Sequence, residues 1–142
     1  MRLPVAAEFA NIRILLIEDQ LFIRSMMARM LNGIGFKHVL QARDGQEALD
    51  LIAADREFVD VILCDLKMPN MDGFDFLAKL RELPTGSAQN PVVMLTASND
   101  PESVHRLKEL GIAGYIVKPA STQMVVEGGR VALRAAKRGT SG

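Results

Sequence analysis

The sequence predicts an α/β fold in which a doubly wound sheet of five parallel strands is covered by helices on both faces. Short apolar runs, typical of strands buried on both sides, alternate five times with segments of helical periodicity. The connections between these segments are short, and such alternation implies parallel strands joined by crossover helices. Because crossovers are right-handed, few topologies remain, and the flavodoxin-like strand order 2-1-3-4-5 is the first choice.

The first strand is expected at residues 12–17, where an apolar run ends in two acids. Apolar side chains behind it recur at helical spacing and form the expected core stripe of the first helix: Phe22, Ile23, Met26, Met27, Met30 and Leu31. This helix is expected to end around Asn32-Gly33, with Gly33 or Gly35 as the C-terminal glycine, since glycine is favoured just past a helix end.

A short second strand is expected at residues 38–42, and Asp44 with Glu47 forms a capping-box pattern for the second helix. The third strand, residues 59–64, is an apolar run that leads straight into Asp65. A dense turn behind Asp65 delivers the third helix, and a loop rich in turn residues follows that helix.

Residues 92–95 are expected as the fourth strand, which ends at Thr96. Asp100 and Pro101 are a cap and a first-turn proline, and they open the fourth helix, which Gly111 ends.

The fifth strand is expected at residues 115–117 and ends at Lys118. Ser121 can cap a last helix, but Gly128-Gly129 interrupts that helix, and each glycine costs about 1 kcal/mol relative to alanine. We therefore expect the last helix to be frayed, kinked or reshaped.

Length and composition fit one globular domain. The 142 residues carry 17 basic and 17 acidic side chains, so no global charge favours nucleic acid or a membrane. One cysteine excludes an internal disulfide, and neither a signal peptide nor a membrane span is evident. We expect a cytoplasmic protein with a single domain over residues 1–142: a loose lead-in at 1–11, a core at about 12–126 and a solvated basic tail at about 137–142.

Polar side chains stand at the carboxyl ends of four predicted strands: Glu18, Asp19, Asp65, Thr96 and Lys118. A lone acid at a strand end is more often a loop cap or a solvated charge. Here, however, all five polar residues stand at predicted strand ends, and the carboxyl ends of parallel strands meet at one sheet edge. Clustered carboxylates repel one another, and oxygen ligands at a wet edge suit Mg²⁺. Lys118 adds a positive point charge to the same pocket.

Between residues 12 and about 126 the chain resembles the response-regulator receiver domain (CheY-like). The segments that carry the resemblance are Glu18-Asp19, Asp65 to Gly73, Leu95-Thr96-Ala97 and Lys118-Pro119. The resemblance implies that Asp65 accepts a phosphoryl group from a sensor histidine kinase or a histidine phosphotransfer protein. It further implies the following roles: Thr96 and Lys118 are catalytic beside Asp65; Glu18, Asp19, Asp65 and the carbonyl of Lys67 hold Mg²⁺; and Thr96 with Tyr115 forms a switch.

Lys67 stands two residues after Asp65, and Ser98 stands two residues after Thr96. In the family these positions line the route of the attacking water, so both are expected to tune dephosphorylation. A lysine there could pair with the phosphoryl group and slow its hydrolysis; a solvated surface lysine is an equally good reading. Ala120 replaces the phenylalanine that the family often places after Lys-Pro.

The leading hypothesis is a stand-alone receiver that catalyses its own phosphorylation and dephosphorylation. It would not be an enzyme acting on other substrates. Its output would be a contact between the face formed by the fourth helix, fifth strand and fifth helix and an unknown downstream protein. We expect no direct DNA binding and no membrane partner. The alternatives are a receiver excised from a hybrid kinase or transcription regulator, a pseudo-receiver that binds partners without phosphorylation, and a haloacid-dehalogenase-type phosphatase. That phosphatase class places a second aspartate where Lys67 stands.

Overall fold

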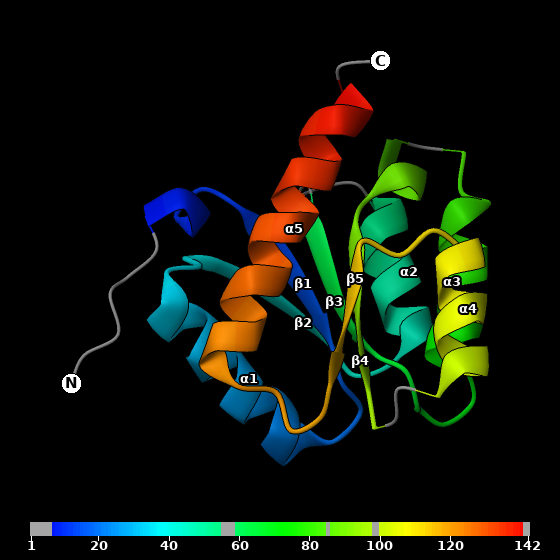
Figure 1. The fold of residues 1–142 in the computed structure, drawn as a ribbon, viewed down its shortest axis with the longest axis horizontal. Coiled ribbons are helices and arrows are strands. Elements are labelled where there is room, and N and C mark those ends of the chain that lie inside the picture. Colours follow the sequence, from blue (N-terminus) through cyan, green and yellow to red (C-terminus); the bar gives the residue numbers. More distant parts are fainter. Residues whose placement is uncertain (1–6, 55–58, 85, 98–99, 141–142) are drawn as a thin grey trace.

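A computed structural model describes residues 7–54, 59–84, 86–97 and 100–140 of the chain (Figure 1). Five strands form one parallel sheet in the order β2-β1-β3-β4-β5, which confirms the predicted topology. The strands are β1 (Arg13–Ile17), β2 (His38–Ala42), β3 (Val61–Asp65), β4 (Val92–Thr96) and β5 (Gly114–Val117). Ser98, a predicted site residue, lies outside the described residues.

Helices cover both faces of the sheet, as Figure 1 shows. They are α1 (Leu21–Ile34), α2 (Gly45–Ala54), α3 (Gly73–Arg81), α4 (Pro101–Glu109) and α5 (Thr122–Thr140), with short 3-10 turns at Ala7–Phe9 and Gly86–Gln89. One apolar core joins α2, α3 and α4 to one face of the sheet, and a second joins α1 and α5 to the other. Within the described residues, no helix has both the length and the apolar character needed to cross a membrane.

Strand residues alternate between the two cores, because successive side chains of a strand point to opposite faces. Leu15 and Ile17 of β1 join the α2–α3–α4 core, whereas Ile14 and Leu16 join the α1–α5 core. All five residues of β3 are buried, which explains why its sequence reads as one continuous apolar run.

The predicted helix starts are confirmed by their side-chain caps. The Asp44 carboxylate accepts a hydrogen bond from the Glu47 backbone N–H at 2.7 Å, and the Asp100 carboxylate accepts one from the Ser103 N–H at 2.8 Å. The Ser121 hydroxyl accepts a bond from the Met124 N–H at 3.1 Å. Each cap satisfies a donor that the first helical turn leaves unpaired.

The expected core stripe of α1 is wrong at two positions. Met27 and Leu31 are buried, but Phe22 is 76% exposed and Met26 is 54% exposed. Phe22 and Met26 each precede a core-facing neighbour by one residue, which turns them about 100° around the helix axis and off the sheet. The apolar stripe is therefore wider than the surface that the sheet covers.

The described part of the lead-in is packed onto the domain, contrary to the loose segment expected. Phe9 is 0% exposed, and its ring stacks on that of Phe36 with 4.4 Å between centroids and 7° between planes. Glu8 pairs with Arg130 of α5, with 2.6 Å between Oε1 and Nε. A single aromatic side chain in a 3-10 turn has no periodicity, so the sequence pattern did not reveal this contact.

The expected break at Gly128-Gly129 is also wrong, since α5 is one continuous helix from Thr122 to Thr140. Gly129 lies against the Phe9 ring: a Cβ atom added there would be 3.0 Å from Phe9 Cζ. The missing side chain thus makes room for the Phe9 ring, and the packing of that ring offsets the weak helix propensity of glycine.

Candidate functional site: the acidic edge of the sheet

The predicted acidic residues converge at the carboxyl edge of the sheet. Glu18 and Asp19 follow β1, and Asp65 is the last residue of β3, the strand that pairs with β1. Each of these three residues offers a carboxylate oxygen that lies within 4.8 Å of the other two. The structure therefore brings together the three side chains that the sequence marked as metal ligands.

Glu18 is the most deeply buried of the three, at 1% exposure. Its Oε1 accepts a hydrogen bond from the Gln20 backbone N–H at 3.2 Å, while its Oε2 is buried without a hydrogen-bond partner among the described residues. Burial, together with the hydrogen bond and the negative charge of Asp65, raises the pKa of Glu18 from 4.5 to about 7. A buried carboxylate oxygen without a hydrogen bond among the described residues, beside two further carboxylates, favours the binding of a cation at this edge.

Lys118 brings an ammonium group into contact with these carboxylates. Its Nζ lies 2.9 Å from Asp65 Oδ1 and 3.9 Å from Glu18 Oε2. The Lys118 backbone N–H donates to the Thr96 carbonyl at 2.8 Å, which ties the start of the β5–α5 connection to β4. One ammonium group cannot neutralise three carboxylates, so an excess of negative charge remains.

The donor set fits Mg²⁺. This ion prefers oxygen ligands and is commonly held by one or two carboxylates with water and phosphate completing its shell. The three carboxylates of the edge meet that requirement, and one of their oxygens, Glu18 Oε2, has no hydrogen bond among the described residues. Cys64, beside Asp65, is fully buried, and its pKa is raised by burial and by the Asp65, Glu18 and Asp72 carboxylates, so it remains a protonated core residue.

The loop after Asp65 is held tightly against β3. The Gly73 N–H donates to the Leu66 carbonyl at 2.7 Å, and a Cβ atom on Gly73 would lie 2.9 Å from Leu66 Cα. Asn70 has a φ of 70°, a left-handed conformation that asparagine tolerates better than most residues. Lys67 is exposed in this loop, and its metal-binding and tuning roles remain predictions.

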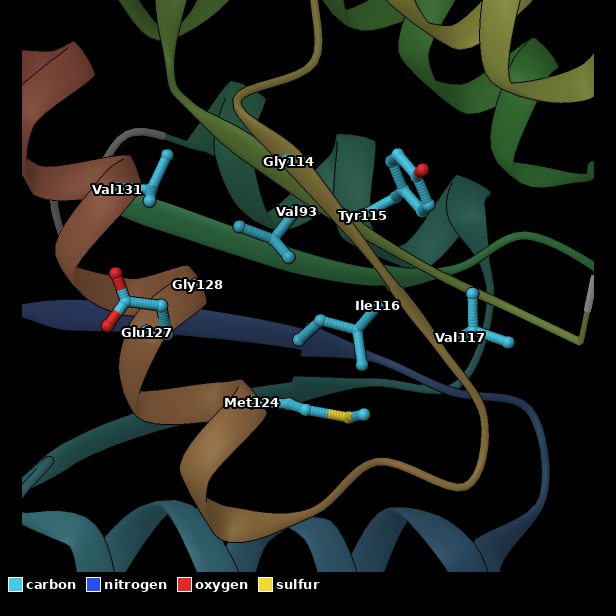
Figure 2. A pocket seen from close by; sticks show the side chains of 9 residues that line it. All are labelled: Val93, Gly114, Tyr115, Ile116, Val117, Met124, Glu127, Gly128 and Val131. Carbon is cyan, nitrogen blue, oxygen red and sulfur yellow. The ribbon is translucent and has the colours of Figure 1, made fainter. Parts of the chain in front are cut away.

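Thr96 and Tyr115 lie on the same face of the sheet. Tyr115 pairs with Met94 in the parallel ladder of β4 and β5, and Thr96 is two residues beyond Met94. Thr96 is buried, whereas Tyr115 is 38% exposed. In Figure 2 the Tyr115 ring lies on the side of β5 away from α5, and Tyr115 lines a cavity of about 340 Å³ together with Met124 and Gly128 of α5.

Sequence reasoning missed Arg24. Its Nη1 donates to the Glu18 backbone carbonyl at 2.8 Å. The one signal in the sequence was a cation close to the amino end of a helix, where the helix dipole disfavours positive charge. A hydrogen bond to a backbone carbonyl cannot be predicted from a sequence pattern, because every residue has such a carbonyl.

Comparison with known proteins agrees with this geometry. A model of the response regulator receiver domain family matches residues 14–128, and the chain belongs to this family. It is therefore a CheY-like receiver domain of the two-component response regulator type, with an acidic cluster at the expected edge.

Two similar curated proteins are regulators by name. The transcriptional regulatory protein PdtaR of Mycobacterium tuberculosis (strain ATCC 25618 / H37Rv) is 37% identical over 109 residues, which are 77% of this chain and 50% of that protein. The probable transcriptional regulator ycf27 of Porphyridium aerugineum is 35% identical over 129 residues, 91% of this chain and 51% of that protein. The chain thus spans about half the length of these relatives.

Among solved structures, the chemotaxis protein CheY4 of Vibrio cholerae is similar with a TM-score of 0.76 and 31% identity, covering 85% of this chain and 98% of that one. A response regulator receiver domain protein from Clostridium thermocellum has a TM-score of 0.77 at 25% identity, covering 91% of this chain and 97% of that one.

Proposed function

We propose that the protein accepts a phosphoryl group on Asp65 from a histidine kinase or a histidine phosphotransfer protein, in a reaction that depends on Mg²⁺. The observation that carries the proposal is the contact of 2.9 Å between Lys118 Nζ and Asp65 Oδ1, beside the acid pair of Glu18 and Asp19. A carboxylate with a lysine and further acids around it is equipped for phosphoryl transfer, in which positioning and charge compensation provide most of the catalysis.

In the proposed reaction, an Asp65 oxygen forms a bond to phosphorus as the phosphorus–nitrogen bond of the donor phosphohistidine breaks. The Lys118 ammonium group then pairs with a phosphoryl oxygen in place of the Asp65 carboxylate. The Thr96 hydroxyl donates a hydrogen bond to a second phosphoryl oxygen. Glu18, Asp19, Asp65 and the Lys67 carbonyl would hold Mg²⁺, which when bound supplies compensation for the negative charge of the carboxylates and the phosphoryl group. The product is an aspartyl phosphate on the chain itself, so we class the protein as a phosphoacceptor and not as an enzyme for other substrates.

An apolar groove that includes Lys118, the ion-pair partner of Asp65, supports a protein as the phosphoryl donor. Phe22 and Met26 are exposed on α1, and a groove of about 410 Å³ runs between α1 and the start of the β5–α5 connection. The groove is lined by Ile23, Met26, Met27, Met30, Leu95, Lys118, Pro119 and Ala120. Lys118 belongs to both the groove and the acidic edge, so a partner seated on α1 would lie next to the acceptor.

We propose the face of α4, β5 and α5 as the output surface. Phosphorylation adds charge and acceptor oxygens at Asp65, which can draw the Thr96 hydroxyl toward them. The space that Thr96 leaves can admit the Tyr115 ring, which now lies on the same sheet face and is partly exposed. A downstream protein would then bind one of the two positions of Tyr115 more tightly.

The competing functions are less well supported. The haloacid-dehalogenase reading needs an acid two residues after Asp65, where Lys67 stands. A pseudo-receiver would not need to keep the buried Glu18 Oε2 atom beside Asp65 without a hydrogen bond among the described residues. The similarity to named transcriptional regulators leaves open a role as the receiver part of a larger regulator.

The proposal is tested by intact mass after incubation with Mg²⁺ and acetyl phosphate, beside an Asp65→Asn variant. One added phosphoryl group on the wild type alone supports it. No adduct on either protein would favour the pseudo-receiver.

A further inference from the structure

We propose that Arg24 is a positioning residue that locks the loop between β1 and α1, so that Glu18 and Asp19 present their carboxylates to Mg²⁺ beside Asp65. The inference rests on the proposed function, since it concerns the metal affinity of the same edge. It adds a residue from outside the acidic cluster whose action reaches the metal through the backbone.

The backbone of Glu18 is held from both sides. Its N–H donates to the Ala42 carbonyl of β2 at 3.1 Å, and its carbonyl accepts from Arg24 Nη1 at 2.8 Å. The Arg24 backbone N–H in turn donates to the Gln20 carbonyl at 2.9 Å. Arg24 therefore joins the end of β1 to the first turn of α1, and these bonds enclose the whole connection between the two elements.

The bond from Arg24 falls at the peptide group that links the two acids. The Glu18 carbonyl belongs to the peptide unit between Glu18 and Asp19, so fixing it limits how both side chains can turn. The Glu18 Oε1 atom also accepts a hydrogen bond from the Gln20 N–H at 3.2 Å, and the buried Oε2, which lies 3.9 Å from Lys118 Nζ, has no hydrogen bond among the described residues. Groups that orient metal ligands in this way commonly change metal affinity 10- to 100-fold when they are removed.

Charge and positioning predict opposite effects of removing Arg24. As a cation bound to the Glu18 backbone carbonyl, Arg24 opposes Mg²⁺ binding at the same edge by Coulomb repulsion, so loss of its charge alone would tighten binding. As a hydrogen-bond donor to the Glu18 carbonyl, it organises the ligands, so loss of the donor would weaken binding. The sign of the change in Mg²⁺ affinity therefore distinguishes the two roles.

The test is Mg²⁺ affinity measured by isothermal titration calorimetry on the wild type, Arg24→Met and Arg29→Met. Methionine keeps an unbranched stem and a helix propensity close to that of arginine, but it has no donor. Arg29 is an exposed arginine of the same helix and serves as the matched control. Thermal unfolding in EDTA measures whether each variant keeps the stability of the metal-free fold.

We expect Arg24→Met to bind Mg²⁺ at least tenfold more weakly, and Arg29→Met to bind within twofold of the wild type. Arg24→Lys, which keeps a charged donor on the same stem, should recover part of the loss. Equal or tighter binding by Arg24→Met would overturn the inference while leaving the proposed function intact. If Arg24→Met fails to fold, Arg24→Ala, which also has no side-chain donor and has a high helix propensity, decides by the same two outcomes. A wild type that binds no Mg²⁺ would overturn the proposed function, and this inference with it.

Discussion

Lys118 Nζ lies 2.9 Å from Asp65 Oδ1, a contact that links the ends of β3 and β5 across the intervening strand β4. Lys118 therefore neutralises part of the Asp65 charge, and in the proposed phosphoryl transfer its ammonium group would pair with the phosphoryl oxygens.

Replacing Lys118 by methionine should slow phosphorylation of Asp65 by acetyl phosphate about a hundredfold, because removal of one preorganised charge-stabilising donor commonly costs 10²–10³ in rate. The rate is measured by intact mass over time at saturating Mg²⁺. Lys108→Met, at an exposed position of α4, is the control and should react at the wild-type rate. Equal rates for both variants would remove Lys118 from the chemistry.

The stability of the metal-free protein should fall as pH rises from 5 to 8. The folded pKa of Glu18 is raised from 4.5 to about 7, so the folded state holds this proton more tightly than the unfolded chain does. That contribution is fully present below pH 4.5 and is lost as pH rises through 7, with a total on the order of 3 kcal/mol.

Urea unfolding in EDTA at pH 5.5 and pH 8 measures this loss of stability. Glu18→Gln should flatten the pH dependence, whereas Glu102→Gln at an exposed position should not. Excess Mg²⁺ should restore stability at pH 8, since it binds the ionised carboxylates. An unchanged pH dependence in Glu18→Gln would contradict the assignment.

Gly73→Ala should destabilise the protein by about 1–3 kcal/mol, since the added methyl group would meet Leu66 Cα at 2.9 Å and Met94 Sδ at 2.8 Å. The shift of Leu66 should also slow phosphorylation of its neighbour Asp65. Gly33→Ala, in α1 with open space around its Cβ position, should instead stabilise by about 0.5–1 kcal/mol. Denaturant unfolding of both variants checks the two signs, and a neutral Gly73→Ala would contradict the close approach.

Phe9→Ala should cost about 3–5 kcal/mol, because it removes a fully buried ring that stacks on Phe36 and fills the space beside Gly129. The control is Phe22→Ala on α1, where the ring is 76% exposed and the change should stay within about 0.5 kcal/mol. Chemical denaturation measures both. Similar costs for the two variants would show that the amino-terminal contact contributes little.

The sequence was sufficient to predict the strand order and the acidic edge. Buried parallel strands are continuous apolar runs, and the polar residue that ends each run marks the sheet edge, as Asp65 does after β3. Caps such as Asp100 are local signals within a few residues, so they too were predicted and are confirmed.

Features that depend on distant partners were not predictable in this way. The burial of Phe9 depends on Phe36 and on the space beside Gly129, residues far from it in the chain. The exposure of Phe22 depends on how much of α1 the sheet covers, which apolar periodicity does not report. Arg24 acts on a backbone carbonyl, and every residue has one.

The measurement that tests the central claim most directly is the position of the phosphoryl group. Treating the acetyl phosphate-labelled protein with sodium borohydride reduces an aspartyl phosphate to homoserine, and peptide mass spectrometry then locates it. The account predicts homoserine at position 65 alone, dependent on Mg²⁺ and absent from Asp65→Asn. Label at another residue such as Asp72, or no label with Mg²⁺ present, would contradict it.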